Sequence, residues 1–321
     1  MPRKETVDVL GVQVTNPHKV IWPQDGITKL DLARYYERMA PTVLRYAARR
    51  PLTLRPFPRG IEQPGFYVKN APKGRPSWVQ TFRDVAESTG SPVDFVVARD
   101  EGDARTLVWI AQYNTVELHP WLSRVDRPDE PDWAVFDLDL HGEAGQEEGQ
   151  ARWRRLTRGA QVLRESLEAR GLRAFPKLSG QSGLHVLVPL ERGAPFDEVR
   201  EFFATLAREA VAAHPALLSV DYDLAGRQGR VLIDYAQNAR GKSTVAPYSV
   251  RPRSGAPVSA PVTWDELDDP QLRPDRWTLR SIFERLERVG DLLAPALELR
   301  QRLPVGHVLS GARLERGTLR P

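Results

Sequence analysis

The stretch AVFDLDL, residues 134–140, places two aspartates inside a run of residues that otherwise has the pattern of a buried strand. Residues two apart on a strand point to the same face, so Asp137 and Asp139 project side by side, away from the core. Two ionised carboxylates at this spacing repel each other, and this repulsion raises the pKa of one of the two aspartates unless a cation lies between them. A hard divalent ion with oxygen ligands removes that repulsion. The stretch therefore predicts a strand that carries a metal site.

A third carboxylate, Asp234, stands in VLIDYAQN, where it again follows an apolar strand and precedes a polar, basic segment. If the sheet brings Asp234 beside Asp137 and Asp139, the three can hold two Mg²⁺ or Mn²⁺ ions for in-line phosphoryl transfer. The alternative is that each aspartate ends a strand and meets only solvent or a basic neighbour. The choice depends on whether the three carboxylates lie together in the fold.

The segment SGQSGLHV, residues 179–186, lies between these carboxylates along the chain. Its glycines permit a sharp turn that exposes backbone N–H groups to an anion. His185 follows the turn and is a potential donor to phosphate. The alternative is an ordinary hairpin turn beside a half-buried histidine.

Composition limits the class of protein. A chain of 321 residues, 41% of them hydrophobic, is long enough to fold around its own core. It contains no cysteine, which excludes disulfides and thiolate zinc sites, and we expect no zinc. The N-terminal segment lacks the apolar core of a signal peptide, and no apolar run is long enough to span a bilayer. We therefore expect a cytoplasmic, nucleoid-associated protein with no membrane partner.

Basic residues are concentrated in two segments, although the formal net charge is only +4. Between Arg38 and Arg83 the sequence has ten lysines and arginines and one acid, Glu62. Between Tyr235 and Trp264 it has four basic residues and no acid. Each segment taken alone is typical of a solvated face. Because both also carry aromatic side chains, together they indicate a phosphate-rich partner such as a nucleic acid.

Helix and strand patterns are mixed along the chain. Apolar residues three to four apart predict helices from Thr28 to Pro41 and around 153–167, 199–210 and 279–293. Short extended runs predict strands at 51–57, 92–100, 106–112, 172–178, 183–190 and 230–236. The SGQSG turn joins two of these strands as a hairpin. We therefore expect an α+β fold with a largely antiparallel sheet flanked by helices.

The order of the motifs is that of a known family. DLD, then SGxxGxH, then IDYxQN followed by GKSTVAPYSVR resembles the polymerase (primase-polymerase) domain of bacterial DNA ligase D, of the archaeo-eukaryotic primase superfamily. The resemblance begins at TNPHKVIWPQDGITKLDLARYYE, passes through GFYVKNAP and VELHPW, and reaches APVSAPVTWDEL and the helix after it, so it covers nearly the whole chain.

The resemblance implies a primase-type catalytic sheet with an additional N-terminal lobe. We expect a single primase-polymerase catalytic domain over residues 1–321. Its parts are an N-terminal lobe for DNA ends and 5′-phosphate at about 1–125, a catalytic metal and nucleotide lobe at about 126–300, and a loose tail at about 305–321.

The resemblance also implies roles for individual residues. The catalytic metal ligands are expected to be Asp137, Asp139 and Asp234, with Asp234 also serving the 3′-hydroxyl side of the reaction. The residues expected at the incoming nucleotide and the template are Ser179, Gly180, His185, His119, Gln237, Lys242, Arg251 and Arg253. Those expected at a downstream 5′-phosphate are Asn16, Lys19 and Arg55, and those expected to stack on DNA are Phe66 and Tyr67. For Lys19 and Arg55 the alternative is a surface ion pair, and for Phe66 it is a place in the core.

Together these roles predict a template-dependent polymerase with two Mn²⁺ or Mg²⁺ ions. It would add NTP or dNTP to a primer 3′-hydroxyl at gapped or broken DNA that carries a downstream 5′-phosphate. A serine hydroxyl near the sugar, that of Ser179, favours ribonucleotides. The expected setting is gap filling before ligation in non-homologous end joining, with a Ku-like end-binding protein and a DNA ligase as candidate partners.

Two other classes of function fit parts of the sequence. A metal-dependent nuclease also uses three carboxylates, but it would shorten DNA without added nucleotides. A non-catalytic DNA-end bridging module would use the basic, aromatic surface alone and tolerate the loss of Asp137 and Asp234. Two features depart from the family pattern: the acidic stretch HGEAGQEEGQ, 141–150, matches no motif, and no KxDG motif of a ligase occurs. We therefore expect a stand-alone polymerase domain, either natural or excised.

Overall fold

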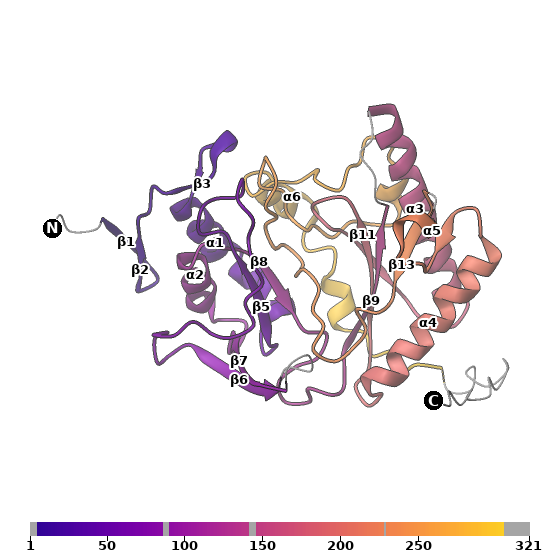
Figure 1. Ribbon diagram of the computed structural model, residues 1–321, viewed down its shortest axis with the longest axis horizontal. Helices are drawn as coiled ribbons and strands as arrows, with labels where there is room; N and C mark the ends of the chain where they lie inside the picture. The colour runs from indigo at the N-terminus through magenta and orange to yellow at the C-terminus, as the bar shows by residue number, and fades with distance from the viewer. Residues whose placement is uncertain (1–4, 86–89, 141–145, 228, 305–321) are drawn as a thin grey trace, which may run out of the picture.

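A computed structural model describes residues 5–85, 90–140, 146–227 and 229–304. Its strands form two main sheets, which lie in opposite halves of the molecule (Figure 1). Four strands between Leu52 and Pro120 make the N-terminal sheet, and five strands between Trp133 and Asp234 make the C-terminal sheet. The predicted metal-site strand belongs to the second of these.

The N-terminal sheet has the strand order β6-β7-β5-β8, and its neighbouring strands pair antiparallel. Its strands are β5 (Leu52–Pro56), β6 (Gln80–Val85), β7 (Pro92–Val97) and β8 (Thr115–Pro120). Two helices pack against each other beside it, α1 (Lys29–Ala47) and α2 (Ala104–Gln112). Two short hairpins complete this half: β1 (Thr6–Val9) with β2 (Val12–Thr15), and β3 (Val20–Trp22) with β4 (Ile27–Thr28).

Helix α1 begins where the sequence predicts. The Thr28 hydroxyl accepts a hydrogen bond from the Asp31 N–H, and the Asp31 carboxylate accepts one from the Thr28 N–H, which is a capping box. The predicted end at Pro41 is wrong, because Pro41 lies inside the helix. The next turn buries Val43 and Leu44 in the core, and this burial outweighs the hydrogen bond that proline removes.

The run 106–112, TLVWIAQ, forms helix α2, so the prediction of a strand there is wrong. The Asp103 carboxylate caps this helix by accepting a hydrogen bond from the Thr106 N–H. Most of the run is buried, and only Thr106 and Gln112 at its two ends are polar. A short, mostly apolar run of this kind is compatible with a buried strand as well as with a buried helix.

The C-terminal sheet has the strand order β10-β11-β9-β13-β12. Its strands are β9 (Trp133–Asp139), β10 (Phe175–Leu178), β11 (Leu184–Pro189), β12 (Leu218–Ser219) and β13 (Val231–Asp234). Neighbours pair antiparallel except for the short parallel pair β12–β13. The long helices α3 (Gln146–Glu168) and α4 (Phe196–Ala213) pack on this sheet (Figure 1). The central strand β9 is the predicted metal-site strand.

The remaining elements are short. They are helix α5 (Leu224–Arg227), helix α6 (Ile282–Val289) and 3₁₀ turns at Pro23–Asp25, Asp265–Asp268 and Ala294–Leu297. Helix α6 is shorter than the apolar pattern 279–293 predicts. The predicted α+β fold with largely antiparallel sheets is confirmed. None of the described helices has the length and apolar character needed to cross a membrane.

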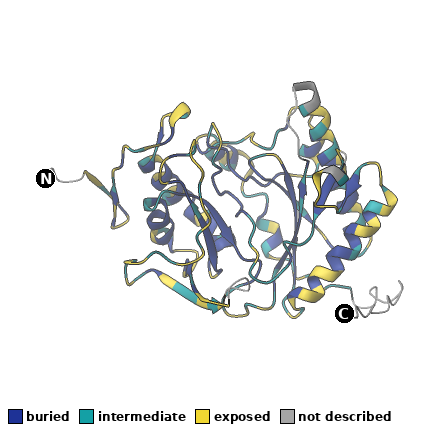
Figure 2. Ribbon diagram, viewed as in Figure 1, coloured by how far each residue is buried: buried dark blue, intermediate teal, exposed yellow. Residues whose placement is uncertain are grey.

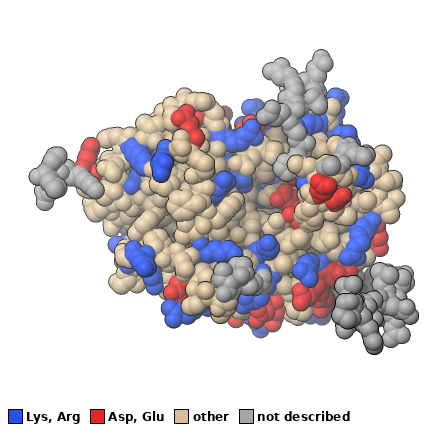
Figure 3. Space-filling model, in the orientation of Figure 1, with Lys and Arg blue, Asp and Glu red and all other residues tan. Residues whose placement is uncertain are grey.

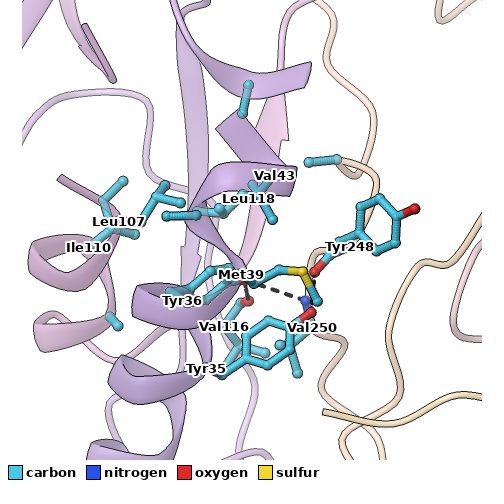
Figure 4. Packing of buried hydrophobic residues seen from close by; sticks show 14 of the residues in the cluster. Tyr35, Tyr36, Met39, Val43, Leu107, Ile110, Val116, Leu118, Tyr248 and Val250 are labelled. Carbon is cyan, nitrogen blue, oxygen red and sulfur yellow. Dashed lines mark hydrogen bonds between the residues drawn. The ribbon is translucent and has the colours of Figure 1, made fainter. Parts of the chain in front are cut away.

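The buried residues of both halves are visible in Figure 2 and form two large hydrophobic clusters. The N-terminal cluster surrounds α1 and the N-terminal sheet and reaches Val135 and Leu187 of the C-terminal sheet, and the other cluster joins the C-terminal sheet to α3 and α4. Segments late in the chain contribute to the N-terminal cluster, as Figure 4 shows for Tyr248 and Val250 beside α1 and β8. The Tyr35 hydroxyl donates a hydrogen bond to the Tyr248 carbonyl at 2.7 Å, and the Tyr36 hydroxyl donates one to the Val116 carbonyl at 2.7 Å. The two halves therefore share chain segments. The predicted lobe boundary near residue 125 stays a prediction, and the tail 305–321 lies outside the described residues.

Candidate active site

A row of polar side chains crosses the middle of the C-terminal sheet. The strand register places Lys177, His185, Asp137 and Asp234 directly opposite one another on β10, β11, β9 and β13. Directly opposed residues of an antiparallel pair point to the same face of the sheet. Asp139 lies two residues beyond Asp137 on β9, so it shares that face. The sheet therefore brings the three predicted carboxylates to one face.

Unbalanced negative charge marks the centre of this row. Burial, followed by the charges of Asp234 and Asp139, raises the pKa of Asp137 to about 7. His185 Nε2 lies 3.4 Å from Asp137 Oδ1, but burial lowers the pKa of His185 well below its usual value, so the imidazole is neutral near pH 7. The effect of the Asp139 charge on the pKa of Asp137 is the repulsion that the spacing of the two aspartates predicts.

The third carboxylate is held by protein donors. Asp234 Oδ1 accepts hydrogen bonds from the Tyr222 hydroxyl at 2.7 Å and the Ala236 N–H at 2.8 Å, and Asp234 Oδ2 accepts one from Gln237 Nε2 at 2.8 Å. Within the described residues, no three histidine, cysteine, aspartate or glutamate side chains are grouped closely enough to hold a metal ion as they stand. The three aspartates do offer the hard oxygen donors that Mg²⁺ and Mn²⁺ prefer. Their chemistry fits such an ion, and Asp234 would join it by exchanging its present partners.

The SGQSG turn is built around the Ser179 hydroxyl. Ser179 Oγ accepts hydrogen bonds from the Gly183 N–H at 2.9 Å and the Gln181 N–H at 3.1 Å, which leaves the hydroxyl proton for a ligand. Arg251 Nη2 donates to Gln181 Oε1 at 2.7 Å, and Arg253 Nη1 donates to the Gln181 carbonyl at 2.8 Å. Both predicted arginines therefore hold the turn from outside.

Two glycines of the turn have no room for a side chain. At Gly180 the backbone has φ +74°, and a Cβ would lie 2.7 Å from Arg251 Cγ. At Gly183 a Cβ would lie 2.6 Å from the Leu138 carbonyl oxygen, on the strand that carries the aspartates. The turn thus lies directly against the predicted metal-site strand.

The variant Gly183→Ala tests whether this contact shapes the site. We expect it to weaken nucleotide binding about tenfold or more, because the added methyl group forces the turn away from β9 at a cost of about 1–3 kcal/mol. Gly149→Ala in α3 is the control, since a Cβ there meets no atom within 4 Å. The measurement is the apparent nucleotide affinity in primer extension, and an unchanged value for Gly183→Ala would contradict the role of the turn.

A buried glutamate organises the facing wall, which the N-terminal sheet supplies. Glu117 on β8 is fully buried, 2.9 Å from Arg55 Nη1 and 2.7 Å from Arg251 Nε. His119 Nε2 is 3.7 Å from the same carboxylate. Burial opposes ionisation of Glu117, but its interactions with His119 and with the Arg251 charge outweigh burial and lower its pKa to about 2. Glu117 is therefore an anion at neutral pH that holds residues from distant parts of the chain.

A cavity of about 480 Å³ lies between the two walls. Of the predicted site residues, its lining includes Asp137, Asp139, Ser179, His185, His119, Gln237, Lys242, Arg251 and Tyr67. Figure 3 shows a hollow between the two halves of the molecule, bordered by both acidic and basic side chains. His119 Nε2 and His185 Nδ1 are buried and have no hydrogen-bond partner in the described part of the chain. Carboxylates, cations and imidazoles from both sheets thus face one space.

The predicted 5′-phosphate residues separate into two places. Asn16 and Lys19 are joined by a hydrogen bond from the Lys19 N–H to the Asn16 carbonyl at 3.0 Å, and Lys19 Nζ donates to the Pro58 carbonyl. Arg55 instead pairs with Glu117 beside the cavity, and no described hydrogen bond or ion pair links it to Asn16 or Lys19. The stacking candidates Phe66 and Tyr67 are 54% and 59% exposed, so Phe66 is not part of the core.

Sequence reasoning missed Lys29 beside Asn16 and Lys19. Lys29 is buried, its Nζ donates to the Thr15 carbonyl at 2.8 Å, and its N–H donates to the Lys19 carbonyl at 2.8 Å. Burial and then the charge of Lys19 lower its pKa to about 8. A lysine in the first turn of a helix opposes the helix dipole. Its place directly after the capping Thr28 was the signal in the sequence that could have identified it.

Comparisons with known proteins agree with this geometry. A family model described as the LigD primase-polymerase domain matches residues 28–293. The chain belongs to this family. A solved structure of the polymerase domain from Mycobacterium tuberculosis Ligase D in complex with DNA has a TM-score of 0.80 and 32% sequence identity, and it covers 89% of this chain and 98% of that chain. The resemblance drawn from the motifs is confirmed.

Curated relatives are longer proteins. A multifunctional non-homologous end joining protein LigD from Pseudomonas aeruginosa is 36% identical over 296 residues, which are 91% of this chain and 34% of that protein. The protein of the same description from Mycolicibacterium smegmatis is 32% identical and matches 88% of this chain and 36% of its own length. A bifunctional non-homologous end joining protein LigD from Bacillus subtilis is 28% identical and matches 87% of this chain and 43% of its own length. The chain thus spans less than half the length of these relatives.

Proposed function

We propose that this LigD-type primase-polymerase domain adds nucleotides to a primer 3′-hydroxyl at gapped or broken DNA ends, under template direction, in non-homologous end joining. The observation that carries the proposal is the carboxylate row: Asp137 and Asp139 on β9 line a cavity rimmed by His119, Arg251 and Lys242, and Asp234 on β13 lies opposite Asp137. Anionic and cationic walls across one space suit a metal–triphosphate complex. The family membership and the DNA-bound polymerase domain among the similar structures support the same function.

Asp137, Asp139 and Asp234 are the residues that would hold the metal ions, Mg²⁺ or Mn²⁺. When bound, such ions stabilise the charge that develops on the attacking and leaving oxygens of an in-line displacement. The chain itself binds and orients the substrate. Arg251 and Lys242 lie on the cavity wall as donors to the triphosphate, and Gln181, Ser182 and Gly183 of the SGQSG turn line the same cavity.

A preference for ribonucleotides would come from Ser179. Its oxygen already accepts two backbone N–H groups, so only its proton remains, and that proton needs an acceptor. A ribose 2′-hydroxyl supplies one and a deoxyribose does not. The preference is part of the proposal and is measured by the ratio of NTP to dNTP addition.

The 5′-phosphate of the downstream strand would bind at Asn16, Lys19 and Lys29. Two lysines on adjoining segments, one of them buried and with a lowered pKa, gain a counter-ion when a phosphate dianion binds between them. We place Arg55 instead with the wall of the nucleotide cavity, because it pairs with Glu117 there. Phe66 and Tyr67 are exposed and would stack on the bases of the DNA.

Lys19→Ala tests the phosphate site. We expect the stimulation of nucleotide addition by a downstream 5′-phosphate to fall about tenfold, because one charge-assisted contact worth about 1.5–3 kcal/mol is lost. Addition to the same gap without the phosphate should change little. Lys73→Ala, which removes an exposed lysine, is the matched control. Equal stimulation in wild type and Lys19→Ala would contradict the assignment.

The function itself is tested by single-turnover extension of a labelled primer across a short gap. The reactions compare substrates with and without a downstream 5′-phosphate, NTP with dNTP, and Mg²⁺ with Mn²⁺. Phosphate-stimulated, template-directed addition supports the proposal. Shortening of the DNA without nucleotides would favour a nuclease, and tight end binding without any reaction would favour a bridging module. A Ku-like protein and a DNA ligase are the proposed partners, since the similar curated proteins are end-joining proteins.

A further inference from the structure

A second cavity, of about 620 Å³, lies at the far end of the C-terminal sheet. Its lining comes from the segment 124–133 before and at the start of β9, the segment 189–192 at the end of β11, and the segment 296–300. Strand β9 rises about 3.3 Å per residue, so its first residue, Trp133, lies roughly 20 Å from Asp139. The two cavities have no lining residue in common. The second cavity is therefore separate from the proposed nucleotide site.

Beside this cavity two arginines share the carboxylate of Asp132; Asp132 and Arg124 line the cavity, and the buried Arg50 does not. Asp132 lies 2.6 Å from the buried Arg50 and 2.9 Å from Arg124, and both guanidiniums bond to it. Its carboxylate balances only one of the two charges. The three side chains together carry one excess positive charge in a place that is largely removed from water.

A second trio repeats this imbalance. Asp126 lies 2.7 Å from Arg192 and 3.6 Å from Arg49. One carboxylate again meets two guanidiniums, so the trio carries one excess positive charge; Asp126 and Arg192 line the cavity, and Arg49 does not. Asp126 and Asp132 both lie between the end of β8 at Pro120 and the start of β9 at Trp133, so a single loop carries both carboxylates.

Arg300 is a further positive charge in the lining of the cavity. Its Nη1 donates to the carbonyls of Leu297 and Leu299, each at 2.8 Å, and no described ion pair joins it to an acid. The nearby Glu191 carboxylate already accepts hydrogen bonds from Arg302 Nε at 2.7 Å and Arg302 Nη2 at 2.9 Å. The remaining lining arginine, Arg127, is balanced by Glu130 at 3.0 Å. Four arginines and three acids line the cavity, so its lining carries one more positive than negative charge.

These cations suit closely spaced phosphates. A guanidinium has five N–H donors in a planar fork, so an arginine that shares a carboxylate keeps donors for a second anion. The indole of Trp133 and the side chains of Leu190 and Leu297 line the same space and lower its polarity, which strengthens attraction for an anion. If the charges served only to join three segments, equal numbers of acids and bases would suffice.

We propose that this arginine-lined cavity binds a chain of closely spaced phosphate groups, independently of the nucleotide site. The phosphates come either from a free polyphosphate group, as in a nucleoside triphosphate, or from the backbone of a nucleic-acid strand. Inorganic tripolyphosphate is the probe for the shared chemistry, and a short single-stranded oligonucleotide is the probe for the strand.

The experiment is calorimetric titration of the full chain with tripolyphosphate at low salt, without metal ions. We expect Arg192→Ala to weaken one class of binding tenfold or more and Asp126→Asn to strengthen it several-fold, because these changes remove and add excess positive charge. Arg208→Ala is the matched control, since Arg208 lies on α4 and pairs with Glu201. Nucleotide addition should be unchanged in all three variants.

Competition then identifies the source of the phosphates. If tripolyphosphate displaces the oligonucleotide from the wild type but not from Arg192→Ala, the cavity binds a strand. If only tripolyphosphate binding depends on Arg192, it binds a free phosphate chain. The same tripolyphosphate isotherm for wild type, Arg192→Ala and Asp126→Asn would overturn the proposal. Because the two variants are expected to shift the affinity in opposite directions, poor folding of one variant cannot imitate the expected result.

Discussion

Replacing Asp139 by alanine is expected to abolish nucleotide addition while the fold and DNA binding are retained. Asp139 ends β9 on the face that lines the nucleotide cavity, where it contributes negative charge rather than core packing. A metal ion that stabilises a phosphoryl-transfer transition state is worth several kcal/mol, so we expect a loss of about 10³-fold or more. The measurement is single-turnover primer extension in Mn²⁺, together with DNA binding by fluorescence anisotropy.

The control for Asp139→Ala is Asp197→Ala, which removes an exposed carboxylate in the first turn of α4. It should leave both extension and binding unchanged. Wild-type extension by Asp139→Ala would contradict the metal assignment. A nuclease activity that disappears in the same variant would keep the metal site and contradict the proposed reaction.

The carboxylate row was predictable because its parts are local patterns. The period of two in AVFDLDL fixes which face Asp137 and Asp139 share, and the glycines of SGQSG fix the hairpin that brings His185 beside them. Asp234 was placed by the same strand-end pattern in VLIDYAQN. Each of these signals lies within about eight residues of sequence. The sheet register then needed only to align them.

The facing wall was harder to predict because its contacts are long-range. Glu117 is not among the predicted site residues, since the sequence around a charged residue in a short apolar segment does not show which residues it pairs with. Those partners, Arg55 and Arg251, are 62 and 134 residues away, and only the folded chain brings them together. The assignment of Arg55 to the 5′-phosphate comes from the resemblance to the family, and the sequence does not show that β5 pairs with β8, where Arg55 meets Glu117. The run 106–112 of helix α2 is predicted as a strand because a short, mostly apolar run is compatible with either a buried strand or a buried helix.

Glu117→Gln is expected to lower the free energy of unfolding by about 3–5 kcal/mol at pH 7, since it leaves the buried Arg251 and the half-buried Arg55 facing a neutral amide. It should also raise the KM for nucleotide more than it lowers kcat, because Arg251 loses the contact that positions it beside the cavity. Glu201→Gln on α4 is the control, where an exposed ion pair is worth less than about 1 kcal/mol. The measurements are urea denaturation and steady-state extension.

The pH dependence separates the charge of Glu117 from the shape of its side chain. Its pKa is about 2 in the folded protein against 4.5 for a free glutamate, so its ionised form stabilises the fold above about pH 4.5. That contribution, about 3 kcal/mol from the shift, is lost as the pH falls from about 4.5 towards 2. The stability difference between wild type and Glu117→Gln should therefore shrink over this range. A difference that stays constant between pH 7 and 3 would mean that packing, rather than the carboxylate charge, holds Arg55 and Arg251 in place.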